Sequence, residues 1–188
     1  MTWQIQGTAL AGAMVINLPA AEDTRGVFVK TFHDTMLKGH GIDFILKESY
    51  FSVSNKDVIR GMHFQLPPHQ HSKIVFCPQG AILDVIVDMR VGSPTYKQWV
   101  GQILSAENHK AFYIPEGFAH GFKSLTNDAI TYYLVSSEYS QVHDTGIRFD
   151  SIGLDWNVAD PIISARDLSF PCIEDFDSPF LFSSTTKT

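Results

Sequence analysis

Several side chains in this sequence could act together on a small anionic molecule. Arg60 and His63 stand in the segment Arg-Gly-Met-His-Phe-Gln, and Lys73 follows His63 by ten residues. Histidine can act as a base near neutral pH, arginine can hold an anion, and lysine can stabilise an oxyanion. Farther along come Ile-Pro-Glu-Gly-Phe-Ala-His-Gly-Phe at 114–122 and a tyrosine pair at 132–133. Together they point to proton-transfer chemistry.

Length and composition suit one globular domain. The chain has 188 residues, 44% of them hydrophobic, and its mean hydropathy is close to zero. A chain of this length can bury a sizeable core. We therefore expect a single domain over residues 1–188, with a less regular C-terminal tail from about residue 160.

Charge and cysteine usage narrow the class of protein. The formal net charge is −6 and the Lys and Arg residues are scattered, so the basic stripe that nucleic-acid binding needs is missing. No apolar run approaches membrane-spanning length, and residues 1–6 do not resemble a signal peptide. Cys77 and Cys172 are too few for a disulfide framework. We expect a cytoplasmic protein that binds neither nucleic acid nor a membrane.

Short runs rich in Val, Ile, Phe, Tyr and Thr alternate with turn signals along most of the chain. This spacing predicts an all-β fold, a jelly-roll β-sandwich or barrel with few short helices, one of them around Asp34 to Lys38. The predicted strands are Gly26 to Phe32, Glu48 to Ser54, Lys73 to Cys77, Ala81 to Asp88, Gln98 to Leu104, Lys110 to Ile114 and Ala129 to Ser136.

Asp84 stands out among the apolar residues of its predicted strand. It alternates with Ile82 and Ile86, so it should point to the same buried face as these residues. A buried carboxylate is costly unless it is paired. We expect Asp84 to meet a cation such as Lys73 or Arg60, or to orient a histidine; a solvent-facing position on an outer strand is the alternative.

Part of the histidine pattern matches that of metal-binding cupins. His69 and His71 form a His-x-His pair, and His120 follows a Pro-x-Gly turn. The glutamate of the cupin pattern is missing, and Lys73 places a cation beside its position, which opposes binding of a divalent ion. We therefore expect no metal, although a metal-dependent cupin isomerase or dioxygenase that uses these three histidines stays an alternative.

Ordered motifs run along nearly the whole chain. The Arg-Gly-x-His-Phe-Gln segment at 60–65 and the segment at 114–122 are the most specific of them. The others are Asp23-Thr24-Arg25-Gly26, Lys73-Ile74-Val75, Asp84 to Asp88, Ser93-Pro94-Thr95, Gln98 to Gly101, Leu104 to Asn108 and Ser164-Ala165-Arg166-Asp167. In these motifs the chain resembles the nucleotide-sugar 3,5-epimerases exemplified by dTDP-4-dehydrorhamnose 3,5-epimerase.

The resemblance implies a cupin-like, metal-free homodimer without a cofactor. Such a protein is an isomerase that inverts C3, C5 or both carbons of a nucleoside diphospho-4-keto-6-deoxy sugar, in deoxysugar or O-antigen-type polysaccharide biosynthesis. Trp3 and Ile5 near the N-terminus could form a strand exchanged between the two subunits.

The resemblance also implies four catalytic roles. His63 removes the acidic hydrogen beside the ketone, with Asp167 as the partner that holds its imidazole. Lys73 faces the oxygen that becomes an enolate. Tyr133 returns a proton from the opposite face. From the residues alone, Tyr133 and His63 could be core side chains and Asp167 an exposed charge.

Seven further residues are candidates for substrate binding. Arg25 and Arg60 match family positions that hold the diphosphate, since guanidinium forks suit phosphate oxygens. Phe28 and Tyr139 could stack on the nucleobase, and His120 falls where the family lines the substrate site. The remaining candidates are Phe28, Glu48, Tyr50, His120 and Tyr139.

Departures from the family pattern cluster around nucleotide recognition. The chain has Glu48-Ser49-Tyr50 where typical members read Gln-Asp-Asn, Lys30 at a usual glutamate and Phe76 at a usual arginine. A carboxylate only accepts hydrogen bonds, so Glu48 would suit the amine of cytosine or the donor edge of guanine better than the oxygens of thymine. The nucleotide, the sugar and the inverted carbon stay open, as does the choice of Asp84 or Asp167 as partner of His63. A noncatalytic sugar-nucleotide-binding jelly roll is the second alternative.

Overall fold

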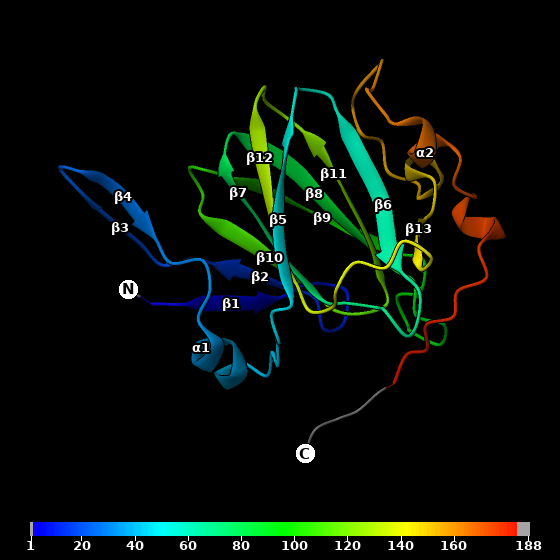
Figure 1. Cartoon of the computed structure of the whole chain (residues 1–188), viewed down its shortest axis with the longest axis horizontal. Helices are drawn as coiled ribbons and strands as arrows, with labels where there is room; N and C mark the ends of the chain where they lie inside the picture. Colours follow the sequence, from blue (N-terminus) through cyan, green and yellow to red (C-terminus); the bar gives the residue numbers. More distant parts are fainter. Residues whose placement is uncertain (1, 184–188) are drawn as a thin grey trace.

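The computed structural model describes residues 2–183, which form thirteen strands, two short α-helices and two 3-10 turns (Figure 1). The elements are β1 (Gln4–Gly7), β2 (Met14–Asn17), β3 (Ala20–Asp23), β4 (Gly26–Val29), α1 (Asp34–Gly39), β5 (Glu48–Ser54), β6 (Ile59–Gln65), β7 (Lys73–Gln79), β8 (Ala81–Asp88), β9 (Trp99–Ser105), β10 (Lys110–Ile114), β11 (Phe118–Ser124), β12 (Ala129–Val135), β13 (Asp144–Gly146), η1 (Phe149–Ser151), α2 (Ala165–Leu168) and η2 (Ile173–Asp175).

Two antiparallel sheets face each other as a jelly-roll sandwich, which confirms the predicted fold class. The six-stranded sheet has the order β1-β2-β10-β7-β12-β5, and the five-stranded sheet has the order β13-β6-β11-β8-β9. A separate hairpin of β3 and β4 projects from the body of the sandwich in Figure 1. Among the described residues, no helix combines the length and apolar character needed to cross a membrane.

Successive residues of a strand point to opposite faces of its sheet, so each sheet contributes both to the core between the sheets and to a core on its outer face. Val75 and Tyr133 from one sheet meet Ile86 and Phe122 from the other in the space between the sheets. The outer face of the six-stranded sheet packs against the α1 region, and the outer face of the five-stranded sheet packs against the C-terminal segment around Trp156. The described part of the C-terminal segment is therefore anchored to the sandwich.

Most predicted elements occur close to their predicted bounds. β5, β8 and β10 coincide with the predicted runs, β4 ends three residues early, and α1 extends the predicted helix to Gly39. His33 caps α1 by accepting the Met36 N–H. The pattern missed β1, β2, β3, β6, β11 and β13 as strands. The single domain over 1–188 stays a prediction, since Met1 and residues 184–188 lie outside the described part.

Two glycines let β6 and β11 approach each other closely beside His63 and His120. Gly61 has a φ of 137°, and a Cβ on it would lie 2.5 Å from the Cα of Gly121. The pairing of the two strands shifts register here, and His63 stands directly opposite His120. A side chain at either glycine would push these strands and their histidines apart.

Candidate active site

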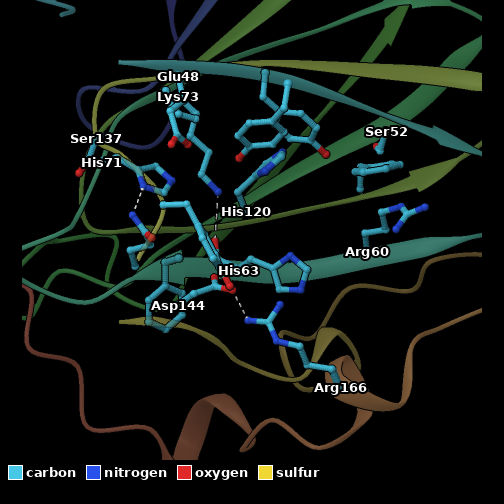
Figure 2. A pocket seen from close by; sticks show the side chains of 17 residues that line it. Glu48, Ser52, Arg60, His63, His71, Lys73, His120, Ser137, Asp144 and Arg166 are labelled. Atoms are coloured by element: carbon cyan, nitrogen blue, oxygen red, sulfur yellow. Dashed lines mark hydrogen bonds and ion pairs between the residues drawn. The ribbon is translucent and has the colours of Figure 1, made fainter. Parts of the chain in front are cut away.

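A cavity of about 420 Å³ lies between the sheets, where β5, β7 and β12 face β6 and β11 (Figure 2). Most of the predicted site residues line it. The lining residues are Glu48, Tyr50, Ser52, Arg60, His63, Phe64, Gln65, His71, Lys73, His120, Phe122, Tyr133, Val135, Ser137, Tyr139, Asp144 and Arg166.

His63 is backed by Asp167, which comes from α2. Nε2 of His63 lies 2.8 Å from Oδ1 of Asp167, and the other carboxylate oxygen accepts the Gly61 N–H at 3.0 Å. Because a carboxylate is an acceptor, a neutral His63 carries its proton on Nε2 and keeps its lone pair on Nδ1. The Asp167 N–H in turn donates to Ser164, the N-cap of α2, at 3.0 Å. His63 can thus act as a base with a fixed tautomer.

Asp167 stays ionised although it is only 3% exposed. Burial acts to raise its pKa, but hydrogen bonds from His63 and from the Gly61 N–H outweigh burial and hold the pKa below its ordinary value. A carboxylate at this position stabilises an imidazolium on His63. The sequence left the partner of His63 open between Asp84 and Asp167, and the geometry selects Asp167.

Lys73 is a buried cation that reaches across the cavity. Its ammonium lies 3.5 Å from the backbone oxygen of His63, and Figure 2 shows the side chain pointing toward β6. Burial lowers the pKa of Lys73 to about 8, while the nearby carboxylates of Asp144 and Asp84 act in the opposite direction. A cation so poorly solvated is available to stabilise negative charge on a bound molecule.

Asp84 is fully buried and meets a histidine rather than either proposed cation. Its Oδ1 lies 2.7 Å from Nε2 of His120, and its Oδ2 has no hydrogen-bond partner among the described residues. Burial raises the pKa of Asp84 and lowers the pKa of His120, so both shifts favour uncharged forms. Of the three predicted roles for Asp84, orienting a histidine is confirmed, and the solvent-facing alternative is wrong.

Tyr133 lines the cavity from β12, in the sheet opposite His63. Its side chain is buried, its ring stacks on Tyr50 with centroids 4.8 Å apart, and it makes a T-shaped contact with the ring of His120, with centroids 5.9 Å apart. Burial, followed by the charge of Asp84, raises the pKa of Tyr133 far above its ordinary value. Its phenol therefore keeps its proton at neutral pH. Tyr132 points to the opposite face of the sheet and packs on Phe76.

The remaining candidates divide into two groups. Arg60, Glu48 and Tyr139 line the cavity, with the Arg60 guanidinium 3.1 Å from the Ser54 hydroxyl. Arg25 and Phe28 do not: they lie on the β3–β4 hairpin, outside the cavity of their own chain. The Arg25 side chain is 88% exposed and pairs with Asp23 at 2.6 Å, and Phe28 is 60% exposed.

The three histidines of the cupin-like pattern do not converge. His71 and His120 line the cavity, but His69 lies outside it and its ring packs against His143 at 4.4 Å. Nδ1 of His71 accepts from the Gln65 amide at 2.9 Å, and Nε2 of His120 meets Asp84. Within residues 2–183, no three His, Cys, Asp or Glu side chains are arranged to hold a metal ion.

Pattern reasoning missed a charged pair at the cavity wall. The Arg166 guanidinium lies 2.6 Å from Oδ2 of Asp144, as the dashed line in Figure 2 marks. Arg166 belongs to the motif at 164–167, so its place beside the candidate residue Asp167 could have indicated that it lies at the site. Asp144 stands in β13, which pairs with β6, and the local sequence gave no indication of this pairing.

Sequence comparison relates this chain to known epimerases. The profile of the family described as dTDP-4-dehydrorhamnose 3,5-epimerase matches residues 7–175. The dTDP-4-dehydrorhamnose 3,5-epimerase of Methanothermobacter thermautotrophicus is 41% identical over 165 residues, which cover 85% of this chain and 89% of the relative.

Solved structures give the same relationship. The dTDP-4-dehydrorhamnose 3,5-epimerase of Bacillus anthracis, solved with TDP and PPi bound, has a TM-score of 0.89 at 36% identity and covers 92% of this chain and 100% of its own. The dTDP-6-deoxy-D-glucose-3,5-epimerase of Legionella pneumophila, in complex with dTDP-4-keto-L-rhamnose, has a TM-score of 0.92 at 31% identity and covers 97% of this chain and 100% of its own.

Proposed function

This chain belongs to the dTDP-4-dehydrorhamnose 3,5-epimerase family, and we propose that it inverts C3, C5 or both carbons of a nucleoside diphospho-4-keto-6-deoxy sugar. It is an isomerase of deoxysugar biosynthesis. One observation carries the mechanism: His63 and Tyr133 come from opposing sheets and line the same cavity. A base and an acid on opposite sides of a sugar ring are what inversion of a carbon requires.

His63 is the base in this proposal. The ketone at C4 acidifies the hydrogens on C3 and C5, and the lone pair on Nδ1 takes one of them while Asp167 steadies the imidazolium that results. A positioned base contributes about 10²–10⁴-fold to the rate. No redox step or cofactor is needed, because the carbon–hydrogen bond that breaks is later formed again.

Lys73 stabilises the enolate that proton removal creates. Its ammonium stands on the His63 side of the cavity, within 3.5 Å of the His63 backbone oxygen. Charge on the ketone oxygen develops only as the proton leaves, so a fixed cation lowers the energy of the intermediate more than that of the bound sugar. Tyr133 then protonates the carbon from the other face and inverts it.

Arg60, Glu48 and Tyr139 serve the nucleotide in this proposal. Arg60 can hold a phosphate with its guanidinium fork. Tyr139 is 62% exposed at the cavity, which suits an aromatic face for a nucleobase. His120 and Tyr50 line the sugar end, beside Tyr133.

Arg25 and Phe28 fit the same proposal if the protein is a homodimer. The hairpin that carries them exposes the apolar side chains of Val27 and Phe28, together with Arg25, whose ion pair with Asp23 stays within the hairpin. We assign this hairpin to the cavity of a second copy. Mixing Arg25→Ala with His63→Ala protein tests the assignment, because only a hairpin that acts on the partner restores one complete site per hybrid dimer.

A cytoplasmic location belongs to the proposal as well. Cys77 and Cys172 are free thiols, as expected for a protein kept in a reducing compartment.

The function is tested by hydrogen exchange. Wild-type protein and His63→Ala protein are incubated in D₂O with dTDP-, CDP- and GDP-linked 4-keto-6-deoxy sugars, and loss of hydrogen at C3 and C5 is followed by NMR. Exchange with at least one sugar, abolished by His63→Ala and retained by the control His69→Ala, supports the epimerase. No exchange at saturating sugar would favour a binding protein, and activity that depends on a stoichiometric metal in elemental analysis would favour a metal-dependent cupin.

A further inference from the structure

Tyr50 and Tyr133 form a stacked pair on the cavity wall. They stand directly opposite each other in the pairing of β5 and β12, and their rings are 4.8 Å apart with an interplanar angle of 25°. Stacked aromatic rings attract each other beyond the contribution of their buried area. The pair therefore restricts the directions in which the Tyr133 phenol can point.

A second aromatic neighbour of Tyr133 is itself fixed. The rings of His120 and Tyr133 are T-shaped, with centroids 5.9 Å apart and an interplanar angle of 75°, and Nε2 of His120 lies 2.7 Å from the buried carboxyl group of Asp84. Tyr133 thus lies between an immobilised imidazole and Tyr50. Tyr50 is 44% exposed and belongs to β5, which is an edge strand of the sheet, so it is the more easily altered of the two supports.

We propose that Tyr50 is a positioning residue for Tyr133, whose stacked ring holds the phenol toward the carbon that lies opposite His63. This inference rests on the proposed function, since Tyr133 needs a fixed direction only if it delivers a proton. Tyr50 does not touch the reacting atoms in this role. It acts through the ring of Tyr133, and its own hydroxyl is not required.

This role predicts that Tyr50 governs inversion more than proton removal. In D₂O, each inversion by wild type takes the hydrogen to His63 and returns deuterium from Tyr133. If the phenol is misdirected, the imidazolium of His63 has time to exchange the proton it took from the sugar with solvent D₂O. It then returns deuterium to the enolate on the original face, which gives exchange without inversion. The ratio of exchange to inversion, measured by NMR at early times, therefore reports the direction of the phenol.

Three variants separate the possible roles of this side chain. Tyr50→Phe keeps the stack, and we expect the ratio of exchange to inversion to stay that of wild type, whatever the change in the two rates. Tyr50→Thr replaces the ring with a small side chain of a residue type that suits a strand. We expect inversion to fall by roughly 10-fold while exchange changes by less than about 3-fold. Tyr50→Leu takes its place if Tyr50→Thr does not fold. Phe51→Ala is the matched control, since Phe51 stacks on Tyr132 on the outer face of the same two strands, with centroids 6.3 Å apart.

The outcomes are distinct. A raised exchange-to-inversion ratio in the ring-less variant, with a normal ratio in Tyr50→Phe and Phe51→Ala, supports the inference. Equal losses of both rates with a lower melting temperature would show a structural role, and a raised KM with unchanged kcat would show only a contact with the sugar; either overturns it. Absence of exchange in wild type would instead refute the proposed function.

Discussion

His63 and Asp167 are 104 residues apart in the chain, yet Nε2 of His63 lies 2.8 Å from Oδ1 of Asp167. The second oxygen of Asp167 accepts the Gly61 N–H, so one carboxylate fixes both the imidazole and the strand that carries it. The C-terminal segment is thereby part of the site, although its residues up to 183 add no strand to either sheet.

Replacing Asp167 with Asn should disable the base without unfolding the protein. An Asn amide can donate to Nε2, which would move the imidazole proton to Nδ1 and remove the lone pair needed for proton abstraction. We expect hydrogen exchange to fall by roughly 10²-fold or more, within the range that a positioned base contributes. Asp150→Asn is the control, because Asp150 pairs with Arg148 away from the cavity. Exchange at the wild-type rate in Asp167→Asn protein would show that Asp167 does not serve His63.

The pH dependence of turnover should report the charge of Lys73. Its pKa is lowered to about 8 by burial, and a lysine is cationic below its pKa, so the cation that we propose for stabilising the enolate is present below pH 8 and lost above it. We expect kcat to fall as the pH rises through about 8.

Two variants check this assignment. Lys73→Arg keeps a cation at high pH and should remove or raise the alkaline limb, whereas Lys73→Met should lower kcat throughout. If kcat of the Lys73→Arg protein falls at the same pH as that of wild type, the alkaline limb belongs to another titrating group. Lys123→Met is the comparison for a buried lysine, since Lys123 donates to the backbone oxygens of Trp156 and Asn157 and does not line the cavity.

Tyr133→Phe should separate proton removal from inversion. The substitution keeps the ring between Tyr50 and His120 but removes the proton donor. We expect inversion to fall by about 10²-fold or more, while exchange that depends on His63 persists. Tyr132→Phe, on the outer face of the same strand, should leave both rates near wild type. Equal loss of exchange and inversion in Tyr133→Phe protein would contradict the role of Tyr133 as the acid.

Alternation along a strand was a dependable guide to burial. It placed Asp84 on the same face as Ile82 and Ile86, and that face is the inner one. It could not select His120 as the partner, because the register of β8 with β11 depends on pairing that no local pattern encodes. The sequence pattern did not predict β6 and β11 as strands, because Gly61, Gly121 and polar residues interrupt their apolar runs. The motifs in these two segments nevertheless indicated that they belong to the site.

Long-range placement accounts for what the sequence could not predict. Asp167 stands in a segment that reads locally as an exposed charge pair, and only the resemblance pointed to it. Asp144 reaches the cavity because β13 pairs with β6. The motif around Arg25 indicated a role in binding, but a motif cannot reveal that its hairpin projects away from the cavity of its own chain.

Glu48 should influence which nucleotide the protein prefers. It lines the cavity, and a carboxylate accepts hydrogen bonds but cannot donate them. If it faces the base, CDP or GDP should raise the melting temperature more than dTDP, because a hydrogen bond to a charged group is worth about 1.5–3 kcal/mol, or about tenfold or more in affinity.

Thermal-shift titrations of wild type, Glu48→Gln and the control Glu107→Gln with the three nucleotides measure this preference. Glu107 is exposed on the turn between β9 and β10 and does not line the cavity. Glu48→Gln should shift the preference toward dTDP, since an amide can both donate and accept, while Glu107→Gln should keep the wild-type order. A clear preference of wild type for dTDP, unchanged by Glu48→Gln, would place the base away from Glu48 and leave this side chain to the sugar.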